Sequence, residues 1–587
     1  MSSKKTNELD PITTQVVRST LVAAAEEMRL TMVRTAYSPL LYEIQDFGVA
    51  ILNTEGEMLA QGTSMPVFSS CLQVTVRNGL KKFGINGFNP GDIIIANDPF
   101  TTGTHISDTS IYIPIIFDGS LQGFSAVTGH WADIGGIVPG GWCPNSTDVI
   151  QEGMTFPHLK LFDDGVQNDS LMDYINSNNR FPNLVRGDLK AQMATAKTGV
   201  ERYLRLCEKY GADTVRDSMG TVMDQTEVRV RKIVSAMPNG TWSAESFLDH
   251  DGVNKDIPRT IKVTVTIEED EVTVDFDGTS ETAGGPVNIP LAGARSSAEM
   301  AFKSATLPLE PSNEGHVRSL NVKASDNLLT NPSWPAPCDS YGYASVLITD
   351  LVSEALANAV PDRCPAGEYM LFGAFMLRVD PKYGEPFIAV DPVDGGGGAL
   401  STDDGADALI FHMDGDVANL PAEVCETRYP LRMERYELRT EEYGIGKFRG
   451  GLGVIRDYCF LEDDCQIQIA NELTQARPHG LNGGHDGGIN SIKMHAGSNE
   501  EELLTERATG MGPFKTGDVI SLRSAGGGGY GDPLDRDPER VRKEIQNGIV
   551  SSQQAKDFYG VVATRNDSGF EIDQEGTKQT REERRAI

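Results

Sequence analysis

The sequence has no stretch that points to secretion or to a membrane anchor. Its start, "MSSKKTNELDPITTQ", carries two lysines but no apolar segment behind them, so it lacks the pattern of a secretory signal. The longest apolar run is "IYIPIIF" at 111–117, far short of the ~20 residues that a membrane-spanning helix needs. We therefore expect a cytoplasmic protein with no membrane partner.

Paired cysteines are missing as well. The eight cysteines are spread along the chain without a CxxC pair: Cys71, Cys143, Cys207, Cys338, Cys364, Cys425, Cys459 and Cys465. This spacing excludes a zinc finger and gives no support to a disulfide framework. Reduced, mostly buried thiols are the expected state.

Positive charge is scarce, and the common nucleotide and hydrolase motifs are absent. The chain has 52 basic and 84 acidic side chains, a formal net charge of −32. A field of that sign repels phosphate backbones and anionic lipids, so nucleic acid and lipid are poor candidate partners. Neither the phosphate-binding pattern GxxxxGK[ST] nor the nucleophile elbow GxSxG occurs. The glycine clusters "DGGGGAL" and "SAGGGGYGDP" indicate tight turns or close backbone approach instead.

The periodicity that is present predicts an α+β protein of multi-layer mixed sheets with helical segments and several subdomains. Apolar residues at three- and four-residue intervals predict a helix over 11–36, and a second helix is expected over 66–84. Short apolar runs separated by turn residues predict hairpins over 47–62 and 109–130.

Three regions follow from changes in this pattern along the 587 residues. Residues 1–239 hold the candidate site and end in a helix-rich half. Alternating strands begin near 240, and residues 240–564 form a β-rich, glycine-rich region. From 565 to 587 the charged, turn-rich end is predicted to be disordered.

Two of only nine histidines lie close together, each followed three residues later by an aspartate. His105 leads to Asp108, and His130 leads to Asp133. Because the first histidine precedes the predicted hairpin and the second ends it, antiparallel pairing brings them side by side. A divalent metal that activates water is typically held by about three imidazole or carboxylate ligands, with one coordination position left open. The alternative is a loop histidine that caps turns and a hydrogen-bonded core histidine, and the pattern alone leaves both open.

Four further carboxylates are candidates for supporting roles. Asp98 and Asp133 are placed to orient the imidazoles from outside the ligand set. Glu43 and Asp46 precede a predicted strand and suit a general base and its helper. They also fit the polar end of a helix that leads into a hairpin, and the sequence alone favours this structural interpretation.

Several longer stretches resemble one known family. They are "RTAYSPLLYEIQDFGVAILN", "IIIANDPFTTGTHISDTSIYIPIIF", "GHWADIGG", "GTSETAGGPVNIP", "NLPAEVCETRYPLRMERYELR", "YGIGKFRGGLGV" and "SAGGGGYGDPLDRDPERVRKEIQNGIVS". Together, from about residue 10 to 560, they resemble the hydantoinase B/oxoprolinase family. One departure is "TTGTH", where many relatives carry two glycines before Thr-His; it stiffens the loop and leaves the ligands in place.

The resemblance implies a division of labour between two proteins. A hydantoinase A-like partner binds ATP with magnesium and phosphorylates the carbonyl oxygen of the substrate. The B-type subunit holds a divalent metal, zinc or manganese, on ligands that match His105, Asp108 and His130. Asp46 fits the family's "DF" turn and is the implied general base. Glu43 is the second candidate for that role. A heterotetramer or larger assembly is expected.

Three functions are compatible with this resemblance. The first is ATP-dependent hydrolysis of a cyclic amide such as oxoproline, a hydantoin or a larger lactam, which the compact length favours. The second is carboxylation of a ketone of the acetone or acetophenone type. The third is a non-catalytic scaffold for the A-type subunit.

Overall fold

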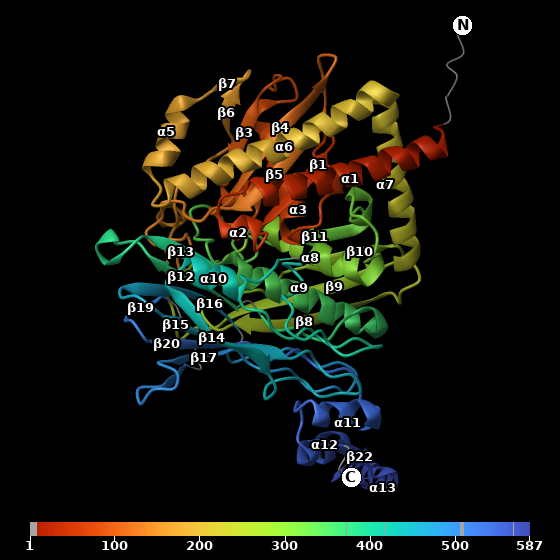
Figure 1. The fold of residues 1–587 in the computed structure, drawn as a ribbon. Coiled ribbons are helices and arrows are strands. Elements are labelled where there is room, and N and C mark those ends of the chain that lie inside the picture. The colour runs from red at the N-terminus through yellow and green to blue at the C-terminus, as the bar shows by residue number, and fades with distance from the viewer. Residues whose placement is uncertain are drawn as a thin grey trace.

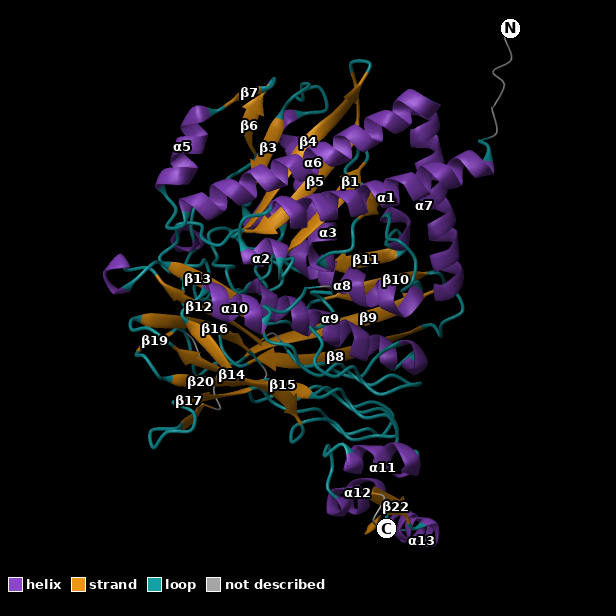
Figure 2. Ribbon diagram, viewed as in Figure 1, coloured by secondary structure: helices purple, strands orange, loops and turns teal. Residues whose placement is uncertain are grey.

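The computed structural model describes residues 9–586 except 371, 416, 473, 505–509 and 567–568. Over these residues the strands form five sheets, and helices pack between and around them (Figures 1 and 2). The predicted α+β class with several mixed layers is confirmed.

The first sheet contains Asp108 and His130, and the other candidate site residues lie in segments next to its strands. Its seven strands follow the order β2-β1-β5-β4-β3-β6-β7, and all neighbours pair antiparallel. The strands are β1 Phe47–Leu52, β2 Met58–Gln61, β3 Ile93–Ala96, β4 Asp108–Phe117, β5 Ser120–His130, β6 Leu159–Asp163 and β7 Val166–Gln167. The β1–β2 and β4–β5 pairs confirm the two predicted hairpins.

Helices cover both faces of this sheet. The long helices α1 Pro11–Thr35, α6 Pro182–Tyr210 and α7 Ala212–Val234 share one hydrophobic core with Val49 and Ile51 of β1. The alternate residues Ala50 and Leu52 point to the opposite face and pack with α3 Pro66–Phe83, as the two-residue period of a strand requires. The short helices of this region are α2 Pro39–Tyr42, α4 Pro99–Thr102 and α5 Asp169–Ser177.

A second layer begins on the far side of α3. Helix α8 Leu291–Thr306 packs against α3, where the Ser296 hydroxyl donates to the Val67 carbonyl at 2.8 Å. Helix α9 Tyr341–Ala357 is almost wholly buried between α8 and the sheet β11-β10-β9-β8. Its strands are β8 Gly240–Leu248, β9 Arg259–Glu268, β10 Glu271–Asp275 and β11 Leu320–Lys323.

Two further sheets complete the main body. The order β13-β12-β16-β19 joins β12 Phe372–Arg378, β13 Phe387–Pro392, β16 Cys465–Asn471 and β19 Met511–Phe514. The order β14-β15-β20-β17-β18 joins β14 Leu431–Arg439, β15 Gly453–Phe460, β17 Ser491–Met494, β18 Glu502–Leu504 and β20 Val519–Arg523. Helix α10 Ala422–Arg428 precedes β14.

The glycine clusters pack backbone against backbone beneath these sheets. Gly451 N donates to Gly397 O at 2.8 Å, and Gly527 N donates to Gly451 O at 3.0 Å. A Cβ atom on Gly527 would lie 2.2 Å from Gly397 O, closer than any side chain can come. The prediction of close backbone approach is therefore confirmed.

The end of the chain, predicted to be disordered from 565, is instead part of a small folded unit. It contains α11 Pro538–Gln546, α12 Ser552–Tyr559, β21 Ala563–Asn566, β22 Gly569–Ile572 and α13 Gln574–Arg585 around its own core. The charges that suggested disorder are used as donors: Arg581 donates to the carbonyls of Tyr559 at 2.9 Å and Arg536 at 2.6 Å. The disorder prediction was wrong because the Arg581 side chain links α13 to α12 and to the segment before α11.

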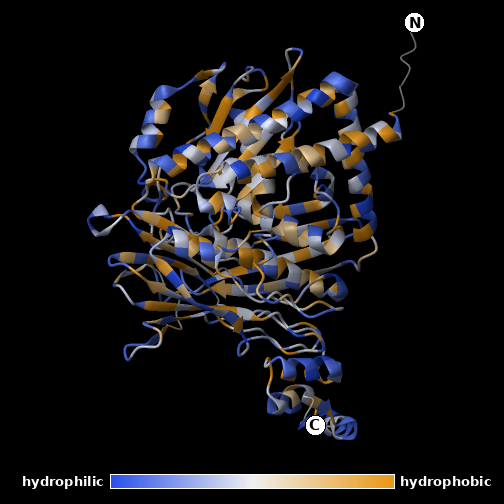
Figure 3. Ribbon diagram, viewed as in Figure 1, coloured by the Kyte–Doolittle hydropathy of each residue, from blue (hydrophilic) through white to orange (hydrophobic). Residues whose placement is uncertain are grey.

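Hydropathy follows this layering. Hydrophobic residues gather in the strands of the first sheet, whereas α11 and α13 are mainly hydrophilic (Figure 3). Among the helices of the described chain, none combines the length and apolar character that crossing a membrane requires.

Candidate metal centre

The paired ends of β4 and β5 place two of the candidate ligands opposite each other. Asp108, the first residue of β4, pairs in register with His130, the last residue of β5. The start of β1 lies beside the same end, because Phe47 pairs with Gly129 and His130 N donates to Asp46 O at 3.1 Å. The predicted hairpin geometry is confirmed.

The loop before β4 brings in His105. Helix α4 ends at Gly103, whose φ of +98° is left-handed and whose added Cβ would lie 2.7 Å from Ala292 Cβ. The following residues are held by the backbone: Asn97 Nδ2 donates to Ile106 O at 2.8 Å, and Trp131 N donates to Ser107 O at 2.9 Å. This bracing fixes the His105 side chain at the end of the hairpin.

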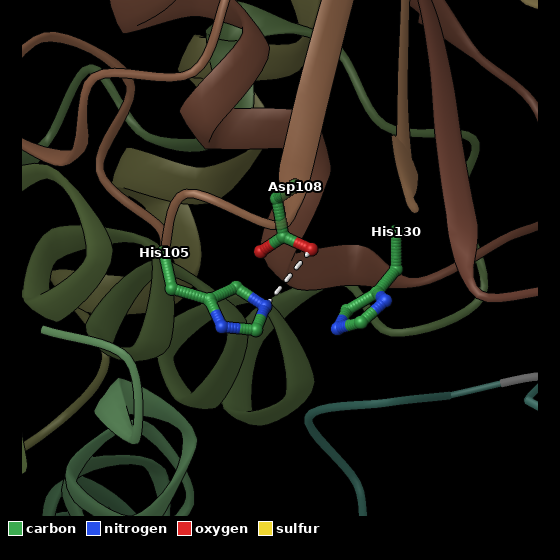
Figure 4. Close-up of side chains that lie close together, drawn as sticks. All are labelled: His105, Asp108 and His130. Atoms are coloured by element: carbon green, nitrogen blue, oxygen red, sulfur yellow. Dashed lines mark ion pairs between the residues drawn. The ribbon is translucent and has the colours of Figure 1, made fainter. Parts of the chain in front are cut away.

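The three side chains converge on one point (Figure 4). His105 Nε2 lies 3.3 Å from Asp108 Oδ1, and the ring centroids of His105 and His130 are 4.9 Å apart. One ligand atom from each residue lies within 4.8 Å of the other two. All three are buried, with 1–3% of their surface exposed. Two imidazoles and a carboxylate at this spacing could hold a divalent metal ion.

Unpaired polar atoms test whether a cation fits there. Among the described residues, neither nitrogen of His130 has a hydrogen-bond partner, and Asp108 Oδ1 also lacks one. Each buried polar atom left unpaired costs ~1–3 kcal/mol. A bound cation would satisfy these atoms, so the residues fit a metal.

Two residues at and just before the start of α9 orient His105 and Asp108. His105 Nδ1 lies 2.9 Å from the Asp339 carbonyl oxygen and 3.4 Å from Asp339 Oδ1, although the two residues are 234 positions apart. Tyr341 at the start of α9 donates its hydroxyl to Asp108 Oδ2 at 3.1 Å. These contacts leave Nε2 of His105 facing His130 and Asp108. Orientation of a ligand imidazole through its second nitrogen is the usual support of a metal site.

The surroundings shift the pKa values of the two histidines in opposite directions. Burial lowers the pKa of His105, but the carboxylates of Asp108 and Asp339 outweigh it and raise that pKa well above its ordinary value. Burial and the charge of His105 lower the pKa of His130 to about 4. His130 is therefore a neutral imidazole at physiological pH, the form that binds metal, whereas metal binding at His105 must displace a proton.

An apolar cavity opens onto the three ligands. It has a volume of about 90 Å³, on the order of three water molecules at ~30 Å³ each. Much of its wall is apolar, with Phe68, Trp142, Phe375 and Phe411 among the lining residues, and Trp142 stacks on Phe375 at 5.6 Å. The cavity suits a small molecule with few polar groups.

Asp46 reaches the same cavity from the segment between α2 and β1. Its Oδ1 is buried and has no hydrogen-bond partner within the described part of the chain. Burial and the nearby charge of Asp108 raise the pKa of Asp46 to about 8. A carboxyl group with a pKa near neutrality can both take up and release a proton.

The other predicted carboxylates lie elsewhere. Glu43 caps α2 and is not among the described residues that line the cavity. Asp98 caps α4 by accepting from Phe100 N at 3.2 Å. Asp133 accepts from Arg180 Nη1 at 2.9 Å and Gly140 N at 3.3 Å, and so holds the loop after β5. The prediction that Asp98 and Asp133 orient the imidazoles is corrected: Asp339 contacts His105 instead.

Two functional candidates carry little signal in the sequence. Asp339 and Asp414 both stand outside any repeated spacing, in "APCDSYG" and "FHMDGD". Only contacts between distant parts of the chain bring them to the site: Asp339, just before α9, contacts His105, and Ala418 N, four residues after Asp414, donates to Ile44 O. Sequence spacing could find His105, Asp108 and His130 because one hairpin holds two of them and the third lies just before it.

Comparison with known proteins places this site in a family. The hydantoinase B/oxoprolinase family profile matches residues 10–533. A protein of Pseudomonas sp. (strain NS671), assigned as the B-type subunit of a D-/L-hydantoinase, is 33% identical over 98% of each chain. The crystal structure of the ATP-dependent caprolactamase from Pseudomonas jessenii superposes with a TM-score of 0.89 at 28% identity, over 98% of this chain and 100% of that one. A nucleotide-free acetone carboxylase shares the fold, with a TM-score of 0.87 at 18% identity over 99% and 84% of the two chains.

Proposed function

The chain belongs to the hydantoinase B/oxoprolinase family, and from that membership we propose that it is the B-type subunit of an ATP-dependent cyclic amide hydrolase. An A-type partner would bind ATP and phosphorylate the carbonyl oxygen of the substrate. The observation that carries the proposal is the buried His105–Asp108–His130 group at the end of a small apolar cavity, with Asp46 beside it.

The partner's phosphorylation would remove the main obstacle to hydrolysis. Resonance makes the carbonyl carbon of an unstrained lactam a poor electrophile. Phosphorylation of the oxygen removes the resonance in which nitrogen donates to the carbonyl, and it turns the oxygen into a leaving group, so that water can attack the carbon. The aromatic wall of the cavity suits the hydrocarbon part of such a ring.

His105, Asp108 and His130 would hold a divalent metal, zinc or manganese, which when bound supplies Lewis-acid activation of water. Asp46 would take the proton that the attacking water loses. Asp339 and Tyr341 would keep the ligand atoms in place, since they bind the far nitrogen of His105 and the outer oxygen of Asp108.

A substrate screen tests the proposal. We expect the chain co-expressed with its A-type partner to open at least one of ε-caprolactam, 5-oxoproline and hydantoin, with ATP consumed. The isolated chain should show no ring opening, and calorimetric titration with ATP should show no binding.

Two outcomes of that screen would contradict the proposal. Stoichiometric ATP binding by the isolated chain would contradict the proposal that only the A-type partner binds ATP. ATP-dependent fixation of bicarbonate onto acetone or acetophenone, with no cyclic amide opened, would assign the chain to ketone carboxylation.

A further inference from the structure

Asp414 is a second carboxylate in the cavity wall. It is only 8% exposed and lines the same cavity as Asp46 and the three candidate ligands. Its Oδ1 is buried, and nothing in the described chain hydrogen-bonds to it. A buried carboxylate is usually paired, because an isolated charge is costly away from water. An unpaired one facing a ligand cavity indicates that its partner is the ligand.

The backbone holds Asp414 on the side of the cavity that Asp46 shares. Asp414 N donates to Phe411 O at 3.1 Å and closes a turn. Four residues later, Ala418 N donates to Ile44 O at 2.8 Å, which ties this loop to the segment that carries Asp46. The two aspartates therefore come from distant parts of the sequence but have fixed places in one wall.

The surroundings of Asp414 favour its neutral, protonated form. Burial, followed by the negative charges of Asp46 and Asp108, raises the pKa of Asp414 well above its ordinary value. A carboxyl group kept neutral near pH 7 can serve as a proton donor. Asp46 and Asp414 are thus two carboxyl groups that line one small cavity.

In the proposed reaction, the intermediate formed by water addition can break either of two bonds, and a proton donor at the ring nitrogen determines which one breaks. Addition of water to the phosphorylated carbon gives a carbon that bears a hydroxyl group, a phosphate ester oxygen and the ring nitrogen. Phosphate leaves more easily than an unprotonated nitrogen. If the carbon–oxygen bond to phosphate breaks, its electron pair leaves with phosphate, the carbonyl forms again and the lactam is regenerated. ATP would then be spent without ring opening.

We propose that Asp414 is the general acid that protonates the ring nitrogen and commits this intermediate to ring opening. The inference rests on the proposed function. With nitrogen protonated, the carbon–nitrogen bond breaks and its electron pair goes to nitrogen. The new carbonyl forms an acyl phosphate, which a second water hydrolyses to carboxylate and inorganic phosphate.

The protons lost by water equal those gained by the ring nitrogen over the whole ring-opening sequence. The attacking water loses two protons, one as its oxygen bonds to carbon and one as the carbonyl forms. The ring nitrogen gains two and leaves as a primary amine. Asp46 accepts protons on the water side and Asp414 donates them on the nitrogen side, and exchange through water in the cavity restores both groups.

Isotope labelling of the Asp414→Asn complex with its A-type partner tests the assignment. In H₂¹⁸O with ATP and the lactam that the wild type opens, we expect phosphate release to continue while ring opening falls ~10²–10⁴-fold. The recovered lactam should contain ¹⁸O, because regeneration keeps the oxygen of the attacking water. The asparagine side chain has nearly the shape of a protonated aspartate, so the fold should persist.

A matched control and a second variant make the outcome decisive. Asp249 is also buried but does not line the cavity among the described residues, and as asparagine it can still accept from Thr474. Asp249→Asn should keep the wild-type ratio of phosphate to opened ring. If Asp414→Asn does not fold, the ¹⁸O content of the recovered lactam is measured with Asp414→Ser instead. An unchanged ratio and unlabelled lactam in the folded variant would overturn the role of Asp414, whereas a wild-type complex that opens no cyclic amide would instead overturn the proposed function.

Discussion

Replacing His105 with alanine should remove the bound divalent metal while the protein stays folded. The variant loses one of three ligands and the contact that links Asp108 to Asp339. Loss of a mere supporting residue around a metal costs ~10–100-fold in affinity, so we expect more than ~100-fold for a ligand. Elemental analysis after gel filtration measures the metal, and circular dichroism measures the fold.

His412 provides the matched control for this experiment. Its imidazole is also largely enclosed, its Nε2 lies 2.7 Å from the Ser304 hydroxyl, and it is not among the described residues that line the cavity. His412→Ala should retain the metal. Full metal occupancy in a folded His105→Ala protein would show that His105 is not a ligand, and loss from both variants would show that metal content reports general destabilisation.

Replacing Asp46 with asparagine should abolish most ring opening but leave metal content and folding near wild type. The amide has almost the same shape, so the packing survives, but it cannot accept a proton from water. General-base catalysis contributes ~10²–10⁴-fold, and ring opening should fall by that order. Because the partner carries out phosphorylation, ATP cleavage can continue and become uncoupled from product.

The ratio of phosphate released to ring-opened product, measured in the co-purified complex, decides the role of Asp46. Asp46→Asn and Asp414→Asn are distinguished by the label. Without the base, water addition itself is slow, so the recovered lactam should carry little ¹⁸O. Normal turnover and an unchanged ratio in Asp46→Asn would reduce Asp46 to a structural residue at the start of β1.

The metal-ligand group could be predicted from sequence because its geometry is local. Asp108 and His130 are the paired ends of one hairpin, and His105 precedes it by three residues. The two-residue period and central turn of an antiparallel hairpin determine which residues face each other. The fold class followed from similar local patterns, and the family resemblance added the partner and the metal.

The support around those ligands could not be predicted in the same way. Asp339 and Tyr341 reach the site only because the start of α9 contacts Asp108 and the loop before β4, and Asp414 only because its loop is bound to Ile44. Asp133 repeats the spacing of Asp108, but its loop turns toward Arg180. The ordered end of the chain was missed because its arginines donate to backbone carbonyls that composition does not reveal.

The central claim is that His105, Asp108 and His130 form a metal centre. Anomalous diffraction from crystals of the wild-type protein, collected on both sides of the zinc and manganese absorption edges, tests it most directly. We expect one strong anomalous peak between the three side chains, at ~2.0–2.1 Å from the imidazole nitrogens for zinc. Crystals of protein grown with both metals that show no peak between these residues, while His105 still pairs with Asp108, would contradict the account.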